Sequence, residues 1–314
     1  MSAGAVAAVD CGTNSTRLLV AGAEGTTLAR LMTITRLGQG VDATHALAPD
    51  AVARTVEVLR EYRAVMDRHG VGAARMTATS AARDATNRDE FFGPARDAIG
   101  VDAELLDGDE EARLSFAGAT AELDADSGPW LVADIGGGST ELAVGPLEGA
   151  DGPHTVPEAV QSLQLGCVRL SERFLAHDPP LDAEIDAARR FVVDQLDGAV
   201  AERPAFARAR ILVGLAGTVA AAAALDQGLE HYDRAALHHY RLTAPAVRRL
   251  LGDLGGENGA ARRRRPGMEA ARADVIVGGL IALDAILGRF GLDECLTSEA
   301  DILDGLVQTL IAAR

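Results

Sequence analysis

Two stretches of the chain share one pattern of hydrophobic and polar positions. AAVDCGTNSTRLLVAG runs from Ala7 to Gly22, and VADIGGGSTELAVG runs from Val132 to Gly145. In each, an apolar run reaches an Asp, a polar turn with glycine follows, and a second apolar run begins, which predicts a strand, a turn and a strand. Asp, Gly, Ser, Thr and Leu recur at the same offsets, so the two units indicate an internal repeat.

The segments between and after these hairpins alternate strand-like and helix-like patterns. We predict helices over about 51–69, from near Asp109, from about Val168, over about 269–290 and over 301–314, and a buried strand that enters a helix through Gly214 and Gly217. The expected fold is α/β, with two related domains, 1–124 and 125–314, that face each other across a cleft. The charged, turn-rich stretch 122–129 marks the junction. Packing of the last helix, 301–314, on the first domain is left open.

The polar turns of the hairpins point to phosphate and metal chemistry. A glycine turn exposes backbone N–H groups that can approach phosphate oxygens closely, and Ser and Thr hydroxyls add donors. Asp134 and Glu141 would repel a phosphate unless a hard cation lay between them, and Mg²⁺ held by carboxylates and phosphate oxygens is the common solution. Asp10 recurs at the position of Asp134, whereas Arg17 stands where the second copy has Glu141. One hairpin thus supplies charge for phosphate and the other for metal.

Composition narrows the function classes. The chain has 314 residues and a formal net charge of −16, and all 30 of its basic residues are Arg. Without Lys, a Walker A phosphate loop and Schiff-base chemistry are excluded. The acidic surface disfavours extended nucleic acid. No apolar run approaches the roughly 18 residues of a membrane span, and no secretion signal opens the chain, so we expect a cytoplasmic protein without membrane contact.

Eight motifs in order give the chain a family resemblance. They are DCGTNSTRLLV, ATSAARDATN, DGDEEARLSFAGA, DIGGGSTEL, SLQLGCVRLSERF, LAGTVAAAAAL, RADVIVGGLIAL and SEADILDGLV. The paired hairpins with Gly-Leu-Ala-Gly-Thr resemble the superfamily of actin, sugar kinases and heat-shock ATPases, which implies two ribonuclease H-like domains. The finer resemblance is to the Ppx/GppA branch of exopolyphosphatases and guanosine pentaphosphate phosphatases, in its short two-domain form.

This resemblance implies roles for individual residues. Glu111, the second Glu of the EEAR motif, is the expected general base that activates water, while Glu110 is an ordinary helix-end acid. Arg83 is the expected phosphate-contacting arginine. The predicted substrate-binding set is Gly12, Thr13, Asn14, Ser15, Arg17, Arg83, Gly136, Gly137, Gly138, Ser139, Thr140, Gly217 and Thr218. The predicted ligands of Mg²⁺, or of another divalent cation, are Asp10, Asp134 and Glu141.

Other reactive residues receive plainer interpretations. Cys11, Cys167 and Cys295 lack paired metal-ligand spacing and are read as reduced thiols. The histidines at 231, 238 and 239 are read as structural. The arginine run 262–265 is either a solvated loop or a guide for a polyanion, and charge runs are usually the former.

Three functions compete at this stage. The first is an Mg²⁺-dependent exopolyphosphatase that releases orthophosphate from inorganic polyphosphate. The second is a guanosine pentaphosphate phosphohydrolase with the same machinery. The third, a nucleotide-dependent kinase or actin-like ATPase, is disfavoured because no sugar site or adenosine pocket is recognisable. The oligomeric state is left open, with a homodimer as one option.

Overall fold

The computed structural model describes residues 4–146 and 155–314. The chain forms two compact units, Met1–Gly118 together with Ile302–Arg314, and Ala119–Asp301. The ranges 1–124 and 125–314 stay a prediction of the sequence. Ala119 and Thr120, at the end of a continuous helix, are buried residues of the second unit. The last helix belongs to the first unit.

The first unit is built on a five-stranded sheet. Its strands are β1 (Ala5–Cys11), β2 (Ser15–Ala21), β3 (Thr27–Ile34), β4 (Val71–Ala78) and β5 (Ala103–Leu105), in the order β3-β2-β1-β4-β5. The first three are antiparallel neighbours, and β4 and β5 add in parallel. The unit's helices are α1 (Val41–Thr44), α2 (Pro49–Arg68), α3 (Ser80–Asp84), α4 (Asp89–Ile99), α5 (Gly108–Thr120) and α13 (Ile302–Ala312).

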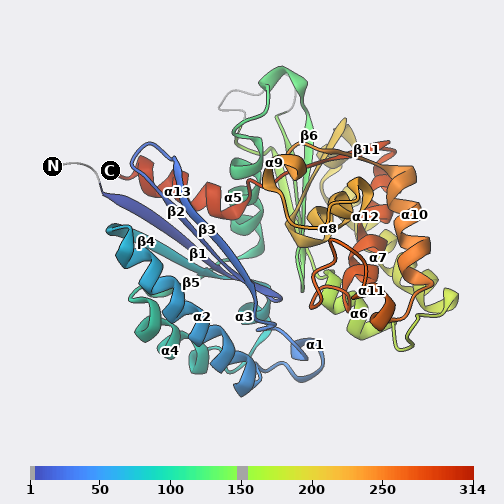
Figure 1. Cartoon of the computed structure of the whole chain (residues 1–314). Coiled ribbons are helices and arrows are strands. Elements are labelled where there is room, and N and C mark those ends of the chain that lie inside the picture. Colours follow the sequence, from blue (N-terminus) through green and yellow to red (C-terminus); the bar gives the residue numbers. More distant parts are fainter. Residues whose placement is uncertain (1–3, 147–154) are drawn as a thin grey trace. The chain divides into compact units, whose positions relative to one another are not determined.

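Helices cover both faces of this sheet (Figure 1). On one face, Val9, Leu18 and Val20 pack with Leu59 of α2 and Phe91 of α4. On the other face, apolar residues of β1 and β2 pack with α5 and α13: Val6, Ala8, Leu19, Leu114, Ile302, Leu303 and Leu306. The alternation of inward residues along each strand follows the two-residue period of a pleated strand. The same period places Asp10, Arg17 and Met32 on the α5 and α13 face.

The second unit repeats this topology in a six-stranded sheet. Its strands are β6 (Trp130–Ile135), β7 (Thr140–Gly145), β8 (Ala159–Leu163), β9 (Ile211–Leu215), β10 (Arg241–Thr243) and β11 (Glu294–Thr297), in the order β10-β11-β9-β6-β7-β8. Its helices are α6 (Cys167–Phe174), α7 (Asp182–Glu202), α8 (Ala216–Gln227), α9 (Arg234–Leu237), α10 (Ala244–Gly255), α11 (Gly259–Arg262) and α12 (Ile276–Phe290). Helices α7, α8, α10 and α12 contribute to one large apolar core.

Strands β6, β7, β8, β9 and β11 occupy the positions that β1, β2, β3, β4 and β5 hold in the first unit. The predicted internal repeat is therefore a repeat of topology. One predicted element is wrong in extent: the long helix begins at Ile276 and not near Glu269. Residues 269–275 form turns, in which the Arg272 N–H bonds the Glu269 carbonyl and the Val275 N–H bonds the Arg272 carbonyl. Within 4–146 and 155–314, no helix has the length and apolar character needed to cross a bilayer.

Candidate active site

The two hairpins have the same register. In the first, Asp10 lies opposite Arg17 and Cys11 opposite Thr16; in the second, Asp134 lies opposite Glu141 and Ile135 opposite Thr140. A Cβ on Gly12 would lie 3.2 Å from the Ser15 carbonyl oxygen, and one on Gly136 would lie 3.1 Å from that of Ser139. Both turns are therefore tight in the same way, which explains a glycine directly after each strand end.

The carbonyl groups of both turns are occupied by the protein. In the first turn, the Thr13 oxygen accepts from the Gly38 N–H at 2.8 Å, and the Asn14 oxygen accepts from the Thr35 and Arg36 N–H groups at 3.1 and 2.9 Å. In the second turn, the Gly136 oxygen accepts from Cys167 and the Gly137 oxygen from Val168, each at 2.9 Å.

The N–H groups of the same turns lack such partners. Among the described residues, no protein acceptor is found for the N–H groups of Thr13, Asn14, Gly137 and Gly138. Consecutive N–H groups of this kind are the ordinary donors of an anion-binding turn.

Asp10 and Arg17 form an ion pair at the end of the first hairpin. The Arg17 guanidinium donates to Asp10 Oδ2 from Nη2 at 2.6 Å and from Nε at 3.1 Å, and Thr77 Oγ1 donates to Oδ1 at 3.3 Å. Asp10 is 2% exposed and was predicted as a metal ligand; the structure gives it Arg17 as its partner. This contact fixes the direction of the arginine at the strand end.

Glu111 and Arg83, predicted separately as base and phosphate ligand, are brought together in the first unit. Arg83 lies on α3 directly after β4, and its Nη1 donates to Glu111 Oε2 at 2.6 Å and to the Leu106 carbonyl at 3.0 Å. Glu111 is 8% exposed, whereas the neighbouring Glu110 is exposed. The Asp107 carboxylate accepts from the Glu110 N–H at 2.7 Å, so Asp107 supplies the acid at the beginning of α5.

Asp134 and Glu141 are cross-strand neighbours in the second hairpin, and both are buried. Glu141 Oε1 accepts from Ser162 Oγ at 2.7 Å. Carboxylate oxygens are the ligands that hard divalent cations prefer, and Mg²⁺ is commonly held by one or two carboxylates together with phosphate oxygens. Two buried carboxylates opposite each other therefore fit such a cation. No group of three or more His, Cys, Asp or Glu side chains with ligand geometry occurs within 4–146 and 155–314.

The beginning of α8 adds an arginine that sequence reasoning missed. The Arg272 guanidinium lies so close over Gly217 that a Cβ there would overlap it, and Arg272 is 8% exposed. The preceding residue, Ala216, has φ 67°, a strained value for a residue with a side chain. Thr218 is 1% exposed and a Cβ on Gly279 would overlap its side chain, so its hydroxyl points into the helix packing. Arg272 stands in the RADVIVGGLIAL motif, which was the available signal.

The arginine run 262–265 is largely neutralised. Arg262 is buried and donates to Asp178 at 2.5 Å, Arg263 pairs with Asp274, and Arg265 pairs with Glu257 at 2.5 Å. These ion pairs leave the run with less charge for a polyanion, and Arg262 lies buried at the end of α11 rather than in a solvated loop.

Among the described residues, the three cysteines and the neighbouring histidines 238 and 239 show no sign of a reactive site. All three thiols are free and buried, and burial raises the pKa of Cys11, of Cys167 and, to about 12, of Cys295. His238 accepts from the Glu299 N–H at 3.0 Å through Nδ1 and contacts Glu122 at 3.2 Å through Nε2, and its ring stacks on His239. These contacts agree with a structural role.

Comparison with known proteins identifies the family. The model of the Ppx/GppA phosphatase family matches residues 19–311. The chain belongs to this family. The predicted resemblance is confirmed, and with it an enzyme that hydrolyses phosphoanhydride bonds. Exopolyphosphatase 2 of Mycobacterium tuberculosis is 43% identical over 97% of this chain and 98% of its own.

Other members of the Ppx/GppA family support the fold. A crystal structure of an exopolyphosphatase-like protein has a TM-score of 0.93 and 35% identity, and covers 98% of this chain and 99% of its own. The Ppx/GppA enzyme of Aquifex aeolicus has a TM-score of 0.79 at 29% identity over 98% of this chain and 99% of its own. The predicted α/β fold with two related units is thereby confirmed.

Proposed function

We propose that the chain is an exopolyphosphatase, which removes the terminal phosphate of inorganic polyphosphate as orthophosphate. The observation that carries this proposal is the 43% identity to a protein named exopolyphosphatase, which extends over nearly the full length of both chains. The site agrees with it. A buried carboxylate, Glu111, and two turns of free N–H donors are the parts that phosphoanhydride hydrolysis requires.

In this mechanism Glu111 acts as the general base. Its carboxylate accepts a proton from water as the water oxygen forms a bond to the terminal phosphorus. The bond from that phosphorus to the bridging oxygen breaks, and the shortened chain leaves with the electron pair. Arg83 holds one oxygen of Glu111 at 2.6 Å, which orients the carboxylate as a positioned base. Proton acceptance by a positioned side chain contributes about 10²–10⁴-fold to a rate.

The remaining residues bind the substrate. In each unit, the N–H groups of the hairpin turn would bind phosphate oxygens, as would the guanidinium group of Arg17 in the first unit and that of Arg272 in the second, since a planar guanidinium binds phosphate through two hydrogen bonds at once. Asp134 and Glu141 would hold Mg²⁺ or another divalent cation. The cation would neutralise charge on the phosphate oxygens. A net charge of −16 makes such local neutralisation necessary, because the protein as a whole repels a polyanion.

A second substrate has support from two relatives that share another name. The guanosine-5'-triphosphate,3'-diphosphate pyrophosphatase of Aeromonas hydrophila is 30% identical over 97% of this chain, but the match spans only 59% of that longer protein. The same site would remove the terminal 5'-phosphate of guanosine pentaphosphate. We favour polyphosphate because the exopolyphosphatase relative is matched over its whole length.

The test measures orthophosphate release with Mg²⁺ and without ATP. Purified protein is given polyphosphates of defined length and, in parallel, guanosine pentaphosphate. We expect a higher kcat/KM for polyphosphate. Hydrolysis of guanosine pentaphosphate alone would replace the proposal with the second function, and release from neither substrate would overturn both.

A further inference from the structure

The turn of the second hairpin is bound along its carbonyl groups by α6. The first three N–H groups of this helix all donate to the turn. Cys167 donates to the Gly136 carbonyl at 2.9 Å. Val168 and Arg169 donate to the Gly137 carbonyl at 2.9 and 3.1 Å. Because the first N–H groups of a helix have no acceptor inside it, the turn supplies the acceptors that the helix lacks.

The next carbonyl of the turn is bound by a side chain. The Arg169 guanidinium donates from Nε to the Gly138 carbonyl at 2.7 Å and from Nη2 to Gln164 Oε1 at 3.0 Å. Two donors of one planar group point in different directions, so these two bonds together fix the plane of the guanidinium. The half-buried Arg169 thus extends the contact between α6 and the turn by one peptide unit.

These bonds set the direction of the N–H groups of the turn. A peptide unit is planar and trans, so its C=O and N–H groups point to opposite sides. The carbonyls of Gly136, Gly137 and Gly138 point toward α6. The N–H groups in the same peptide units, those of Gly137, Gly138 and Ser139, therefore point away from it. In the described part of the chain, no protein acceptor is found for these three N–H groups.

Three consecutive glycines make such a restraint necessary. Glycine adopts positive and negative φ about equally readily, so the peptide units between glycines turn over at little cost. Donors that already point at the position of an anion need no reorganisation when the anion binds. The approach of the two backbones is close, since a Cβ on Gly166 would lie 2.4 Å from the Gly137 carbonyl oxygen. The guanidinium of Arg169 restrains the peptide unit that follows.

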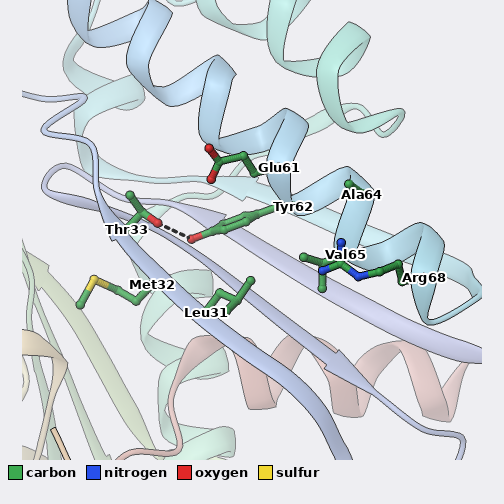
Figure 2. A pocket seen from close by; sticks show the side chains of 8 residues that line it. All are labelled: Leu31, Met32, Thr33, Glu61, Tyr62, Ala64, Val65 and Arg68. Atoms are coloured by element: carbon green, nitrogen blue, oxygen red, sulfur yellow. Dashed lines mark hydrogen bonds between the residues drawn. The ribbon is translucent and has the colours of Figure 1, made fainter.

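The first hairpin is held by other contacts. Backbone N–H groups of the segment after β3 bind its turn carbonyls. Beyond the turn, the Tyr62 hydroxyl donates to the Thr16 carbonyl at 2.8 Å and lies 3.2 Å from Thr33 Oγ1, in a pocket between β3 and α2 (Figure 2). A substitution of Arg169 therefore acts on the second turn and leaves these contacts in place.

We propose that Arg169 is a positioning residue of the site that hydrolyses phosphoanhydrides. Its guanidinium holds the peptide unit between Gly138 and Ser139 so that the Ser139 N–H stays directed at a phosphate oxygen of the substrate. Arg169 acts through the turn and does not touch the substrate. This role rests on the proposed binding of phosphate by the N–H groups of the second turn.

Substitution of Arg169 tests this role in the rate of phosphate release. Arg169→Met removes every donor and keeps an unbranched apolar side chain. We expect its kcat/KM to fall by about tenfold or more, because loss of one aimed donor costs about 10²–10³-fold in rate. Arg169→Lys keeps one charged donor and should recover part of the loss. The matched control is Arg173→Met on the exposed side of α6, which should keep kcat/KM near wild type.

The NMR signal of the Ser139 amide proton reports on its direction without turnover. Imidodiphosphate serves as the probe, because NH replaces the bridging oxygen and the analogue is not cleaved. In the wild-type protein with Mg²⁺, saturation should move this signal downfield, since the N–H forms a charge-assisted hydrogen bond to the phosphate. In Arg169→Met, most of this downfield shift should be lost even at saturation, while Arg173→Met should show it in full.

Several results would overturn this role of Arg169. Wild-type kcat/KM in Arg169→Met would do so, as would an unmoved Ser139 signal in the wild-type protein. A full shift at saturation in Arg169→Met, with weaker affinity, would mean that Arg169 contacts the phosphate itself. Equal losses of activity in Arg169→Met and Arg169→Lys, with lower melting temperatures, would mean that Arg169 supports the packing of α6.

Failure of the proposed function gives a different result. A wild-type protein that releases phosphate from neither polyphosphate nor guanosine pentaphosphate would overturn that function. The imidodiphosphate titration would still decide the role of Arg169, because it measures the direction of the Ser139 N–H at a bound phosphate and requires no hydrolysis.

Discussion

The Glu111 carboxylate is buried and held in one orientation, which suits the general base that we propose. A carboxylate on the protein surface would lack both properties. It is 8% exposed, and one oxygen is bonded to Arg83, which is itself fixed by the Leu106 carbonyl. The neighbouring Glu110 lies on the exposed side of α5. Two adjacent glutamates therefore differ in burial and partner, and this difference allows a matched test.

We predict that Glu111→Gln lowers kcat for phosphate release by about 10²–10⁴-fold, because the amide cannot accept the proton from water. The substrate dissociation constant should stay within a few-fold of wild type or decrease, since a negative charge near phosphate is lost. Glu110→Gln serves as the control and should retain near wild-type turnover. Initial rates and equilibrium binding of polyphosphate measure the two effects separately. Near wild-type kcat for Glu111→Gln would remove this residue from the base role.

The sequence alone identified several residues of the candidate site, but it did not predict which of them contact each other. Glu111 and Arg83 were predicted from two motifs, but their ion pair links positions far apart in sequence and depends on how α3 follows β4. Arg272 was missed for the same reason. Its place over Gly217 becomes visible only in the structure, because a helix predicted through 269–290 hid it.

At the scale of elements, the two hairpins differ at one cross-strand position. The first has Asp10 opposite Arg17, which form an ion pair, and the second has Asp134 opposite Glu141. Like charges directly opposite each other in a sheet are destabilising, whereas opposite charges are favourable. We therefore propose that the same backbone unit binds an anion in one copy and a cation in the other.

This difference predicts that substitutions in the second hairpin weaken Mg²⁺ binding, whereas substitutions in the first do not. Asp134→Asn and Glu141→Gln should each raise the Mg²⁺ concentration for half-maximal activity, by at least the roughly 10–100-fold that loss of a supporting residue around a metal costs. In the same variants, the gain in melting temperature on adding Mg²⁺ should shrink, because the folded state binds the cation less tightly.

Arg17→Gln is the matched substitution in the other hairpin. It should raise the KM for polyphosphate and leave the Mg²⁺ midpoint near wild type, since Arg17 faces phosphate in the proposed site. If both carboxylate variants keep the wild-type Mg²⁺ midpoint and the wild-type shift in melting temperature, the second hairpin does not hold the cation.

The sequence predicted those helices and strands whose hydrophobic residues recur with a clear period. Both hairpins and helix α2 follow directly from the sequence, with α2 beginning at Pro49, a favoured first residue of a helix. Strands β10 and β11 were not predicted. They have three and four residues, too few for a periodic signal, and their pairing with β9 depends on packing of the whole second unit.

At the scale of the whole molecule, the first and last described residues of the chain, Gly4 and Arg314, meet in the first unit. Helix α13 packs against β1, β2 and α5 through Ile302, Leu303 and Leu306, and the Arg314 guanidinium donates to the Gly4 carbonyl at 2.6 Å. The hydrophobic pattern predicted this helix but not the surface it covers. That surface is the face of the sheet on which α5 lies, so α13 supports the helix that carries Glu111.

A substitution at Gly305, where α13 contacts the backbone of α5, tests whether α13 supports α5. A Cβ at Gly305 would overlap the Leu114 carbonyl oxygen of α5, and backbone on both sides leaves no flexible side chain to yield. We predict that Gly305→Ala separates α13 from α5, lowers the free energy of unfolding by about 1–3 kcal/mol as overpacking commonly does, and reduces kcat by displacing Glu111. Urea unfolding and phosphate release at saturating substrate measure the two effects.

Gly198, in the middle of α7, provides the matched control because a Cβ there meets nothing within 4 Å. Gly198→Ala should raise the free energy of unfolding by about 0.5–1 kcal/mol, the usual gain of alanine over glycine inside a helix, with kcat unchanged. Loss of stability in Gly305→Ala with full kcat would mean that α13 stabilises the fold without positioning α5. Unchanged stability and kcat would mean that the two helices separate without cost. Loss of both, beside a stabilised control, would show that α13 holds Glu111, the proposed general base, in position.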